Sequence, residues 1–306
     1  MKKSDITPEL VARLIADQFP LWAGLAIRSV EPSGSDNITF RLGDTLSVRL
    51  PRAAAFAAQV DKEQRWLPVL AGQLPLAIPE PVALGHPNRW FPWPWSIYRW
   101  LEGEPATVGR ISDLKVFAAE LARFLGTLYR IDAGGGPPAG EHNFFRGGPL
   151  DVYDEQTRHS IQLVAGEIDA EAAVEVWEAS LASKWDRPPV WIHGDVAPAN
   201  LLVVDGVLRA VIDFGCTAVG DPACDLAIAW TFFTDGNRQV FHRRLGLDSG
   251  TWARGRGWAL WKALMTLAAE KKRHSDGRIA ALRFGWRLNP RTLIEEVLAD
   301  HRKCLT

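Results

Sequence analysis

The chain has 306 residues, 47% of them hydrophobic and 23% charged, and its 35 basic and 36 acidic side chains leave a formal charge of -1 at pH 7. This balance excludes the basic excess of a dedicated nucleic-acid binder, and no apolar run reaches the roughly 18 residues of a membrane span. Three cysteines cannot all form disulfides with one another, which favours a reducing compartment. The first residues also show no secretory signal pattern, so we expect a cytoplasmic protein.

The first part of the sequence alternates helical and strand patterns. Thr7, Pro8 and Glu9 form a helix start signal, and Gly43-Asp44 joins two strand patterns into a hairpin. The expected elements are helix 8–19, strands 25–30, 37–42 and 46–50, helix 54–70, and strands 82–84 and 96–101. Residues 1–101 are therefore predicted to form a small, mostly antiparallel sheet with one long inserted helix.

The rest of the sequence is predicted to be mostly helical. One exception is a strand pair joined by Asp205-Gly206, because Asp-Gly between apolar runs is a strong hairpin signal. The expected helices are 113–131, 153–164, 171–184, 223–233, 251–272 and 289–303, and the hairpin strands are 201–204 and 207–212. The fold class is therefore α+β, with a sheet-rich lobe over residues 1–101 and a larger helical lobe over residues 102–306.

Two short motifs near this hairpin carry polar side chains that suit one chemistry. Residues 193–195 read His-Gly-Asp and are followed by Asn200, and residues 213–215 read Asp-Phe-Gly. A tight hairpin brings its two ends together, so Asn200 and Asp213 are expected to lie close to each other. Amide and carboxylate oxygens suit Mg²⁺, and Asp195 can accept the proton of an attacking hydroxyl. Taken singly, each motif is equally well a structural turn; their order and the connecting hairpin favour phosphoryl transfer.

The two motifs, together with Gly-Asp-Pro-Ala-Cys-Asp-Leu-Ala at 220–227, resemble those of the aminoglycoside phosphotransferase family. This broad group includes macrolide, choline, ethanolamine, homoserine and fructosamine kinases. The resemblance implies a protein-kinase-like fold, ATP or GTP as donor, and Mg²⁺. By the same resemblance Asp195 is the catalytic base, and Asn200 and Asp213 are the magnesium ligands. Asp225 is expected either to brace the loop of Asp195 or to cap a helix.

The resemblance also places a nucleotide site in residues 1–101. Arg49 stands where the family usually has a phosphate-binding lysine, with Glu63 as its acidic partner; an ordinary surface ion pair is the alternative. Ser35 lies in the turn expected to cover the phosphates. Arg99 and Leu101 belong to the strand and hinge whose backbone is expected to hold the base.

The acceptor is expected to be a small hydroxyl-bearing molecule rather than a protein. Only five residues separate Gly215 from Asp221, too few for a long activation loop, and Ala197 replaces the lysine typical of protein kinases. An aminoglycoside or related antibiotic is one candidate, and a metabolite of the choline, homoserine or sugar-amine type is another. A nucleotide-binding regulatory protein without catalysis and an interaction scaffold remain alternatives, with neither nucleic acid nor membrane as a partner.

The C-terminal part leaves the acceptor undefined. Its acidic residues fit either a solvated helix face or a site for a cationic acceptor, and its tryptophans fit either the core or a pocket that binds cations by cation–π contact. His142 is an isolated histidine and is expected to be structural. The acidic residues are Glu270, Glu295, Glu296 and Asp300, and the tryptophans are Trp230, Trp252, Trp258, Trp261 and Trp286.

Overall fold

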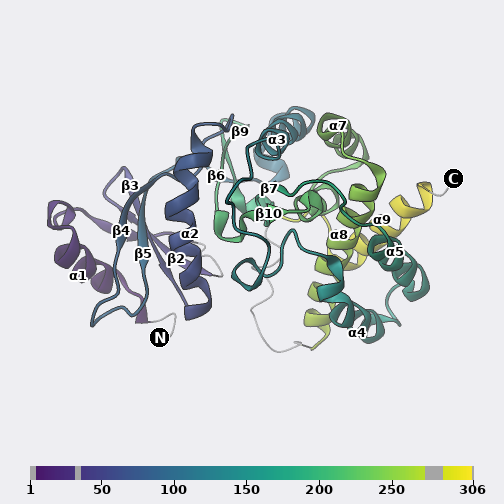
Figure 1. Ribbon diagram of the computed structural model, residues 1–306, viewed down its shortest axis with the longest axis horizontal. Coiled ribbons are helices and arrows are strands. Elements are labelled where there is room, and N and C mark those ends of the chain that lie inside the picture. Colours follow the sequence, from purple (N-terminus) through teal and green to yellow (C-terminus); the bar gives the residue numbers. More distant parts are fainter. Residues whose placement is uncertain (1–4, 32–35, 273–284, 305–306) are drawn as a thin grey trace. The chain divides into compact units, whose positions relative to one another are not determined.

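The computed structural model describes residues 5–31, 36–272 and 285–304. The chain divides into two compact units (Figure 1). The first comprises Met1–Glu102 and Val211–Gly215, and the second comprises Gly103–Ala210 and Cys216–Thr306. The Asp-Phe-Gly motif therefore belongs to the first unit, although more than a hundred residues of the second unit precede it in the sequence.

The first unit is built on a five-stranded antiparallel sheet with the strand order β1-β2-β3-β5-β4. The strands are β1 (Ile27–Ser29), β2 (Asn37–Leu42), β3 (Leu46–Pro51), β4 (Pro81–Gly85) and β5 (Trp95–Arg99). Strands β2 and β3 form the hairpin expected around Gly43, with Leu42 opposite Leu46 and Asn37 opposite Pro51. The antiparallel N-terminal sheet predicted from the sequence is thus confirmed.

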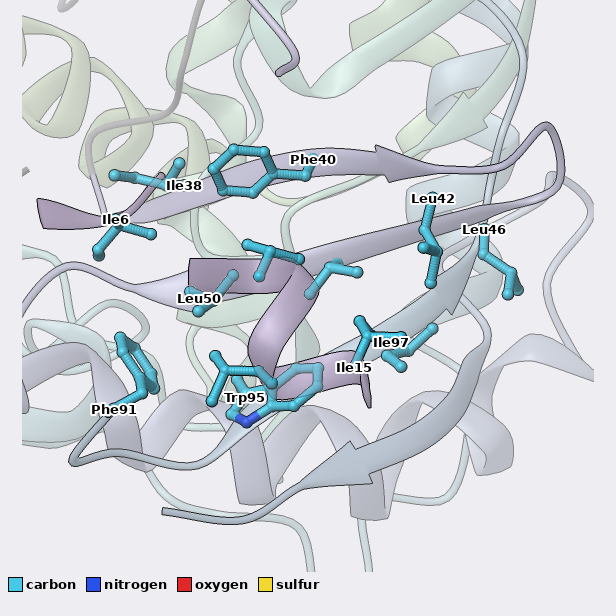
Figure 2. Packing of buried hydrophobic residues seen from close by; sticks show 13 residues of the cluster. Ile6, Ile15, Ile38, Phe40, Leu42, Leu46, Leu50, Phe91, Trp95 and Ile97 are labelled. Carbon is cyan, nitrogen blue, oxygen red and sulfur yellow. The ribbon is translucent and has the colours of Figure 1, made fainter. Parts of the chain in front are cut away.

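Two helices pack on this sheet, α1 (Pro8–Gln18) and α2 (Ala54–Ala71). The buried side chains of α1 join Phe40, Trp95 and Ile97 in one hydrophobic core, which Figure 2 shows from close by. Val48 and Leu50 of β3 belong to the same core. Because side chains alternate along a strand, the intervening Arg49 faces the opposite side of the sheet, where α2 lies.

The second unit is mainly helical, and its long helix α8 packs against α4, α5 and α9. Helix α8 is buried along much of its length, so its side chains are held by neighbours from several parts of the sequence. The helices are α3 (Leu114–Leu128), α4 (Asp154–Val164), α5 (Ala170–Ala182), α6 (Ile228–Thr231), α7 (Asp235–Leu245), α8 (Ser249–Lys272) and α9 (Pro290–Lys303).

Short strands complete the second unit and border the predicted catalytic loop. Strands β8 (Leu201–Val204) and β9 (Val207–Val211) form the expected hairpin, with β6 (Glu104–Pro105) beside β8. Asp205 and Gly206 at its turn have φ values of 50° and 78°, the left-handed pair of a type I′ turn. A further pair, β7 (Val190–Ile192) and β10 (Ala218–Gly220), was not predicted, because three-residue strands are too short for a periodic pattern.

Two helical regions differ from the sequence prediction. Residues 223–233, expected as one helix, form a 3₁₀-helix, Pro222–Ala227, followed by the single-turn α6. Asp221 caps the 3₁₀-helix by accepting a hydrogen bond from the Ala223 N–H, so the helix-cap reading of Asp225 is wrong. Helix α7 was not predicted, because its sequence is mostly polar and the aromatic Phe241 is its one large buried apolar side chain.

Candidate active site

The loop that carries Asp195 follows strand β7 and depends on a glycine at position 194. Gly194 has a φ of +84°, a conformation that L side chains rarely adopt. A Cβ atom at this position would also lie 2.3 Å from the carbonyl oxygen of Cys216. The close approach of these two backbone segments therefore requires glycine and fixes the start of the loop.

Asp225 holds this loop from inside the second unit. Its carboxylate is fully buried and accepts hydrogen bonds from the N–H of His193 at 3.0 Å and of Gly194 at 2.7 Å. Tyr129 donates a weaker hydrogen bond to it at 3.4 Å. Burial raises the pKa of Asp225, and the backbone donors and nearby positive charges oppose that rise. The bracing role expected for Asp225 is confirmed.

Asn200 lies directly against Asp195 within the same unit. It ends the 3₁₀-helix Pro198–Asn200, and its Nδ2 donates to the backbone carbonyl of Asp195 at 2.9 Å and to its Oδ2 at 3.4 Å. The backbone N–H of Asp195 in turn donates to Nδ1 of His193 at 3.2 Å. These bonds use the amide nitrogen of Asn200, and no described hydrogen bond engages its amide oxygen.

Two cationic side chains that were not predicted from the sequence lower the pKa of Asp195. Nζ of Lys262, on α8, lies 3.1 Å from Oδ1 of Asp195, and Arg146 acts on the carboxylate through its charge. Burial would raise the pKa of Asp195, but the charge of Lys262 and then that of Arg146 outweigh it and lower the pKa to about 2. The carboxylate is therefore ionised at neutral pH, as a proton acceptor must be.

In the first unit, Arg49 connects two carboxylates. Its Nη2 donates to Oδ1 of Asp213 at 2.7 Å, and its Nη1 donates to Oε1 of Glu63 at 3.4 Å. The Arg49 and Glu63 side chains are 16% and 5% exposed, so they do not form the surface ion pair considered as the alternative. Tyr98 donates its hydroxyl to the other oxygen of Glu63. Burial would lower the pKa of Arg49, but these carboxylates raise it, which keeps the guanidinium charged.

The backbone around Asp213 is held in an unusual conformation. Asp213 has a φ of 67°, in the left-handed region that few non-glycine residues occupy. Nζ of Lys62 donates to the carbonyl oxygen of Gly215 at 2.7 Å, and a Cβ on Gly215 would lie 2.6 Å from Oε1 of Gln59. Helix α2 thus packs directly on this segment and stabilises the strained residue, a combination common at functional sites.

Three further residues are predicted for the nucleotide site, namely Ser35, Arg99 and Leu101. Ser35 lies outside the described residues. Arg99 ends β5, and its guanidinium is mostly exposed and pairs with Glu80 at 3.1 Å. Leu101 follows it in a partly buried, irregular segment. The Arg99 side chain is thus engaged by Glu80, and a role for this stretch in the nucleotide site would come from its backbone.

Two acidic residues of the C-terminal helix, Glu296 and Asp300, bind arginines of the second unit. Glu296 pairs with Arg238 and Arg287, and Asp300 pairs with Arg238 at 3.5 Å and Arg256 at 3.2 Å. Neither interpretation made from the sequence, a solvated face or a site for a cationic acceptor, describes these two carboxylates. They hold α9 to its neighbours.

The tryptophans and His142 are mostly structural. Trp230, Trp252 and Trp258 are at most 4% exposed and belong to the core, which is one of the two alternatives left open by the sequence. His142 contacts the carbonyl oxygen of Pro138 at 2.8 Å through Nε2. Trp261 is partly exposed and lies beside Trp258 on α8, where both rings contact Arg146.

A comparison with family models identifies the group to which this site belongs. The model described as "Phosphotransferase enzyme family" matches residues 29–258, which include both units' motifs. The chain belongs to the phosphotransferase enzyme family. No helix among the described residues of this family member has the length and apolar character needed to cross a membrane. No curated protein sequence matches the chain at a significant level.

Solved structures from the phosphotransferase family share the fold over nearly the whole chain. The GDP and kanamycin complex of aminoglycoside phosphotransferase APH(2")-IIIa has a TM-score of 0.72 and 20% identity, covering 95% of this chain and 98% of that chain. The streptomycin–ATP complex of APH(2")-IIa has a TM-score of 0.60 and 17% identity, covering 93% and 95%. The macrolide 2'-phosphotransferase MphH from Brachybacterium faecium has a TM-score of 0.60 and 23% identity, covering 92% and 97%. The kinase-like fold expected from the sequence is thereby confirmed.

Proposed function

We propose that the protein transfers the γ-phosphate of ATP or GTP to a hydroxyl group of a small molecule. The observation that carries the proposal is the geometry of Asp195, an ionised carboxylate on a loop braced by Asp225 and beside the amide of Asn200. Membership of the phosphotransferase family supports the reaction class. The nucleotides in related complexes, GDP and ATP, support the choice of donor.

In the proposed reaction, Asp195 accepts the proton of the acceptor hydroxyl while the hydroxyl oxygen attacks the γ-phosphorus. The bond between that phosphorus and the oxygen bridging to the β-phosphate breaks, and the products are a phosphate ester and ADP or GDP. A direct transfer of this kind needs positioning and charge stabilisation more than covalent chemistry by the protein. The low pKa of Asp195 makes it a weak base, so its main contribution is to orient the hydroxyl.

Asn200 and Asp213 are proposed as the ligands of Mg²⁺. Their donor atoms suit the ion, since the hydrogen bonds of Asn200 engage its nitrogen and Asp213 uses Oδ1 for Arg49. When bound, the ion would neutralise negative charge on the phosphate oxygens. Arg49 is proposed to bind the α- and β-phosphates, with Glu63 and Tyr98 fixing its guanidinium. Ser35 and the backbone of 99–101 are proposed to contribute to the same nucleotide site.

Aminoglycosides and macrolides are candidate acceptors, because the related structures are those of aminoglycoside and macrolide phosphotransferases. Metabolic alcohols of the choline, homoserine or sugar-amine type form the second group. The short stretch between Gly215 and Asp221 favours a small acceptor over a protein. A regulatory nucleotide-binding protein without catalysis is the alternative that the experiment must separate.

The test combines nucleotide binding with turnover. We expect purified protein to bind ATP or GTP in a Mg²⁺-dependent manner in calorimetry. It should also release ADP or GDP with an aminoglycoside, a macrolide, choline, homoserine or a sugar amine as acceptor, with the phosphorylated product detected by mass. Asp195→Asn should reduce transfer by about 100-fold or more while nucleotide affinity is retained. Asp205→Asn, in the exposed hairpin turn, is the matched control. Equal rates for Asp195→Asn and the wild type would remove Asp195 from catalysis, and Mg²⁺-dependent binding without turnover would support the regulatory alternative.

A further inference from the structure

Two cationic side chains of the second unit, Lys262 and Arg146, act on the carboxylate of Asp195. Lys262 forms an ion pair with the carboxylate, and the charges of Asp195 and Arg146 act on each other. Two other carboxylates of this unit lie near the loop and are already engaged. Asp221 is bound by Arg254 through contacts of 2.6 and 3.2 Å, and Asp225 is occupied by backbone N–H groups. Two cations thus face one available carboxylate.

Arg146 is partly buried and interacts with the hydroxyl of Tyr153, but two of its guanidinium nitrogens lack partners in the described part of the chain. Its Nε and Nη1 atoms are inaccessible to solvent and have no hydrogen-bond partner among the described residues. The guanidinium carbon instead lies 5.2 Å from the ring centroid of Trp258 and 5.0 Å from that of Trp261. Tyr153 closes the aromatic group, with its ring 4.4 Å from that of Trp261. Buried donors without acceptors are costly, and the uncompensated charge of this guanidinium would attract an acidic ligand.

The loop that carries Arg146 is held firmly. Phe144 and Phe145 both have a φ of 55°, which bulky side chains rarely adopt. Nδ2 of the fully buried Asn143 donates to the carbonyl oxygen of Arg146 at 2.8 Å and to that of Cys216 at 3.1 Å. Tyr153 donates its hydroxyl to the carbonyl oxygen of Phe144. These contacts maintain a strained backbone, which is typical of segments that position a functional group.

Helix α8 carries the second cation, Lys262, on the helix face that also carries the two tryptophans beside Arg146. Trp258, Trp261 and Lys262 are related by spacings of three and four residues, so they share one helix face. The described contacts of the Lys262 ammonium engage one of its three donors, the bond to Asp195. An incoming acidic group would therefore meet a free donor of Lys262 as well as the guanidinium of Arg146.

We propose that the acceptor carries a negative charge, a carboxylate or a phosphate, near its reacting hydroxyl, and that Lys262 and Arg146 bind this group. The inference rests on the proposed function, because it assigns an acceptor class to the same Asp195. A polycationic acceptor is disfavoured for two reasons: it would approach two cations, and two acidic residues of α9 that might attract it, Glu296 and Asp300, are bound to arginines.

The charge preference is tested by binding, so that it does not depend on finding the physiological acceptor. With Mg²⁺ and a non-hydrolysable ATP or GTP analogue present, calorimetry would compare glucuronate with glucose, gluconate with sorbitol, and 3-phosphoglycerate with glycerol, and include kanamycin. We expect at least one anion to bind about ten-fold or more tightly than its neutral counterpart. Equal affinities in every pair, or tighter binding of kanamycin than of any anion, would overturn the inference.

Variants identify the residues responsible. Lys262→Met and Arg146→Met should each remove most of the anion preference, whereas Lys271→Met changes an exposed lysine on the same helix and should leave it intact. Lys262→Met alone decides the case if Arg146→Met fails to fold. If Lys262→Met weakens the nucleotide and spares the anions, the two cations serve the donor phosphate and the inference is wrong.

The same titrations separate this inference from the proposed function. Loss of Mg²⁺-dependent nucleotide binding in the wild type would reject the phosphotransferase proposal itself. Retained nucleotide binding, together with phosphorylation of neutral or cationic acceptors in preference to anions, would leave the reaction in place and reject the anionic acceptor.

Discussion

Arg49 and Asp213 lie 164 positions apart in the sequence, and Nη2 of the arginine donates to Oδ1 of the aspartate at 2.7 Å. The same guanidinium contacts Glu63, so a single side chain connects the central strand, helix α2 and the Asp-Phe-Gly segment of the first unit. A lysine has one ammonium group in place of this planar fork and would not make both contacts with the same geometry. The arginine is therefore suited to this arrangement rather than a neutral replacement for lysine.

Replacement of Arg49 tests its role in nucleotide binding. Arg49→Met should weaken Mg²⁺-dependent binding of ATP or GTP by about ten-fold or more, because a charged donor to phosphate is lost. Arg49→Lys, which retains the charge but not the fork, should give an intermediate affinity in calorimetry. Arg28→Met, at an exposed ion pair of the same sheet, is the control. Unchanged affinity for Arg49→Met would assign Arg49 a structural role alone.

The low pKa of Asp195 predicts a pH-dependent contribution to stability. Because the folded-state pKa of about 2 lies below the ordinary value of 3.8, the ionised carboxylate stabilises the protein above pH 3.8, and this contribution is lost as the pH falls towards 2. The difference in unfolding free energy between the wild type and Asp195→Asn should shrink over this interval. For a partly exposed carboxylate we expect a change on the order of 1 kcal/mol. A difference that is constant from pH 5 to 2 in urea titrations would contradict the shift.

Removal of the Asp225 carboxylate should be costly for folding. Asp225→Ala leaves the buried N–H groups of His193 and Gly194 without their acceptor, so the free energy of unfolding should fall by about 3 kcal/mol. Asp225→Asn retains one acceptor oxygen and should cost less. Asp151→Ala, at an exposed position of the same unit, should change it by less than about 0.5 kcal/mol. Urea unfolding measures all three, and equal stabilities for Asp225→Ala and Asp151→Ala would show that the bracing contacts carry no net stabilisation.

Gly194 offers a test of the backbone constraint. Gly194→Ala combines a φ of +84° with a Cβ 2.3 Å from the carbonyl oxygen of Cys216, so it should lower the unfolding free energy by at least about 2 kcal/mol. Gly24→Ala has open space around its Cβ and should be nearly neutral. The comparison is made by thermal unfolding. A stable Gly194→Ala variant would mean that the loop shifts easily, and the fixed position of Asp195 would have to be abandoned.

The predictions from sequence succeeded where local patterns carry the information. The β2–β3 and β8–β9 hairpins have turn residues that indicate their geometry, and α1 has a cap, a proline and an amphipathic pattern. The short strands β7 and β10 lack any such pattern, because they form only when residues distant in sequence pair with each other. Helix α7 depends on the packing of Phe241 and on the buried Arg238, whose carboxylate partners include Glu296.

The candidate site divides in the same way. Asp195, Asn200 and Asp213 stand in motifs with fixed spacing, so they could be predicted from the sequence. Lys262 lies 67 residues beyond Asp195 and belongs to a helix whose pattern indicates only burial. Arg146 lies in an irregular loop whose conformation depends on the buried amide of Asn143. Neither has a local signal, so packing in three dimensions was needed to find them.

The buried carboxylate of Asp225 also makes loop opening observable. The amide hydrogens of His193 and Gly194 both point at this carboxylate, and neither can exchange with solvent deuterium while the loop is closed. Their exchange rates therefore report how often the segment beside Asp195 detaches from the core of its unit. A ligand that locks the segment would slow this exchange at the two amides even if it touched neither of them.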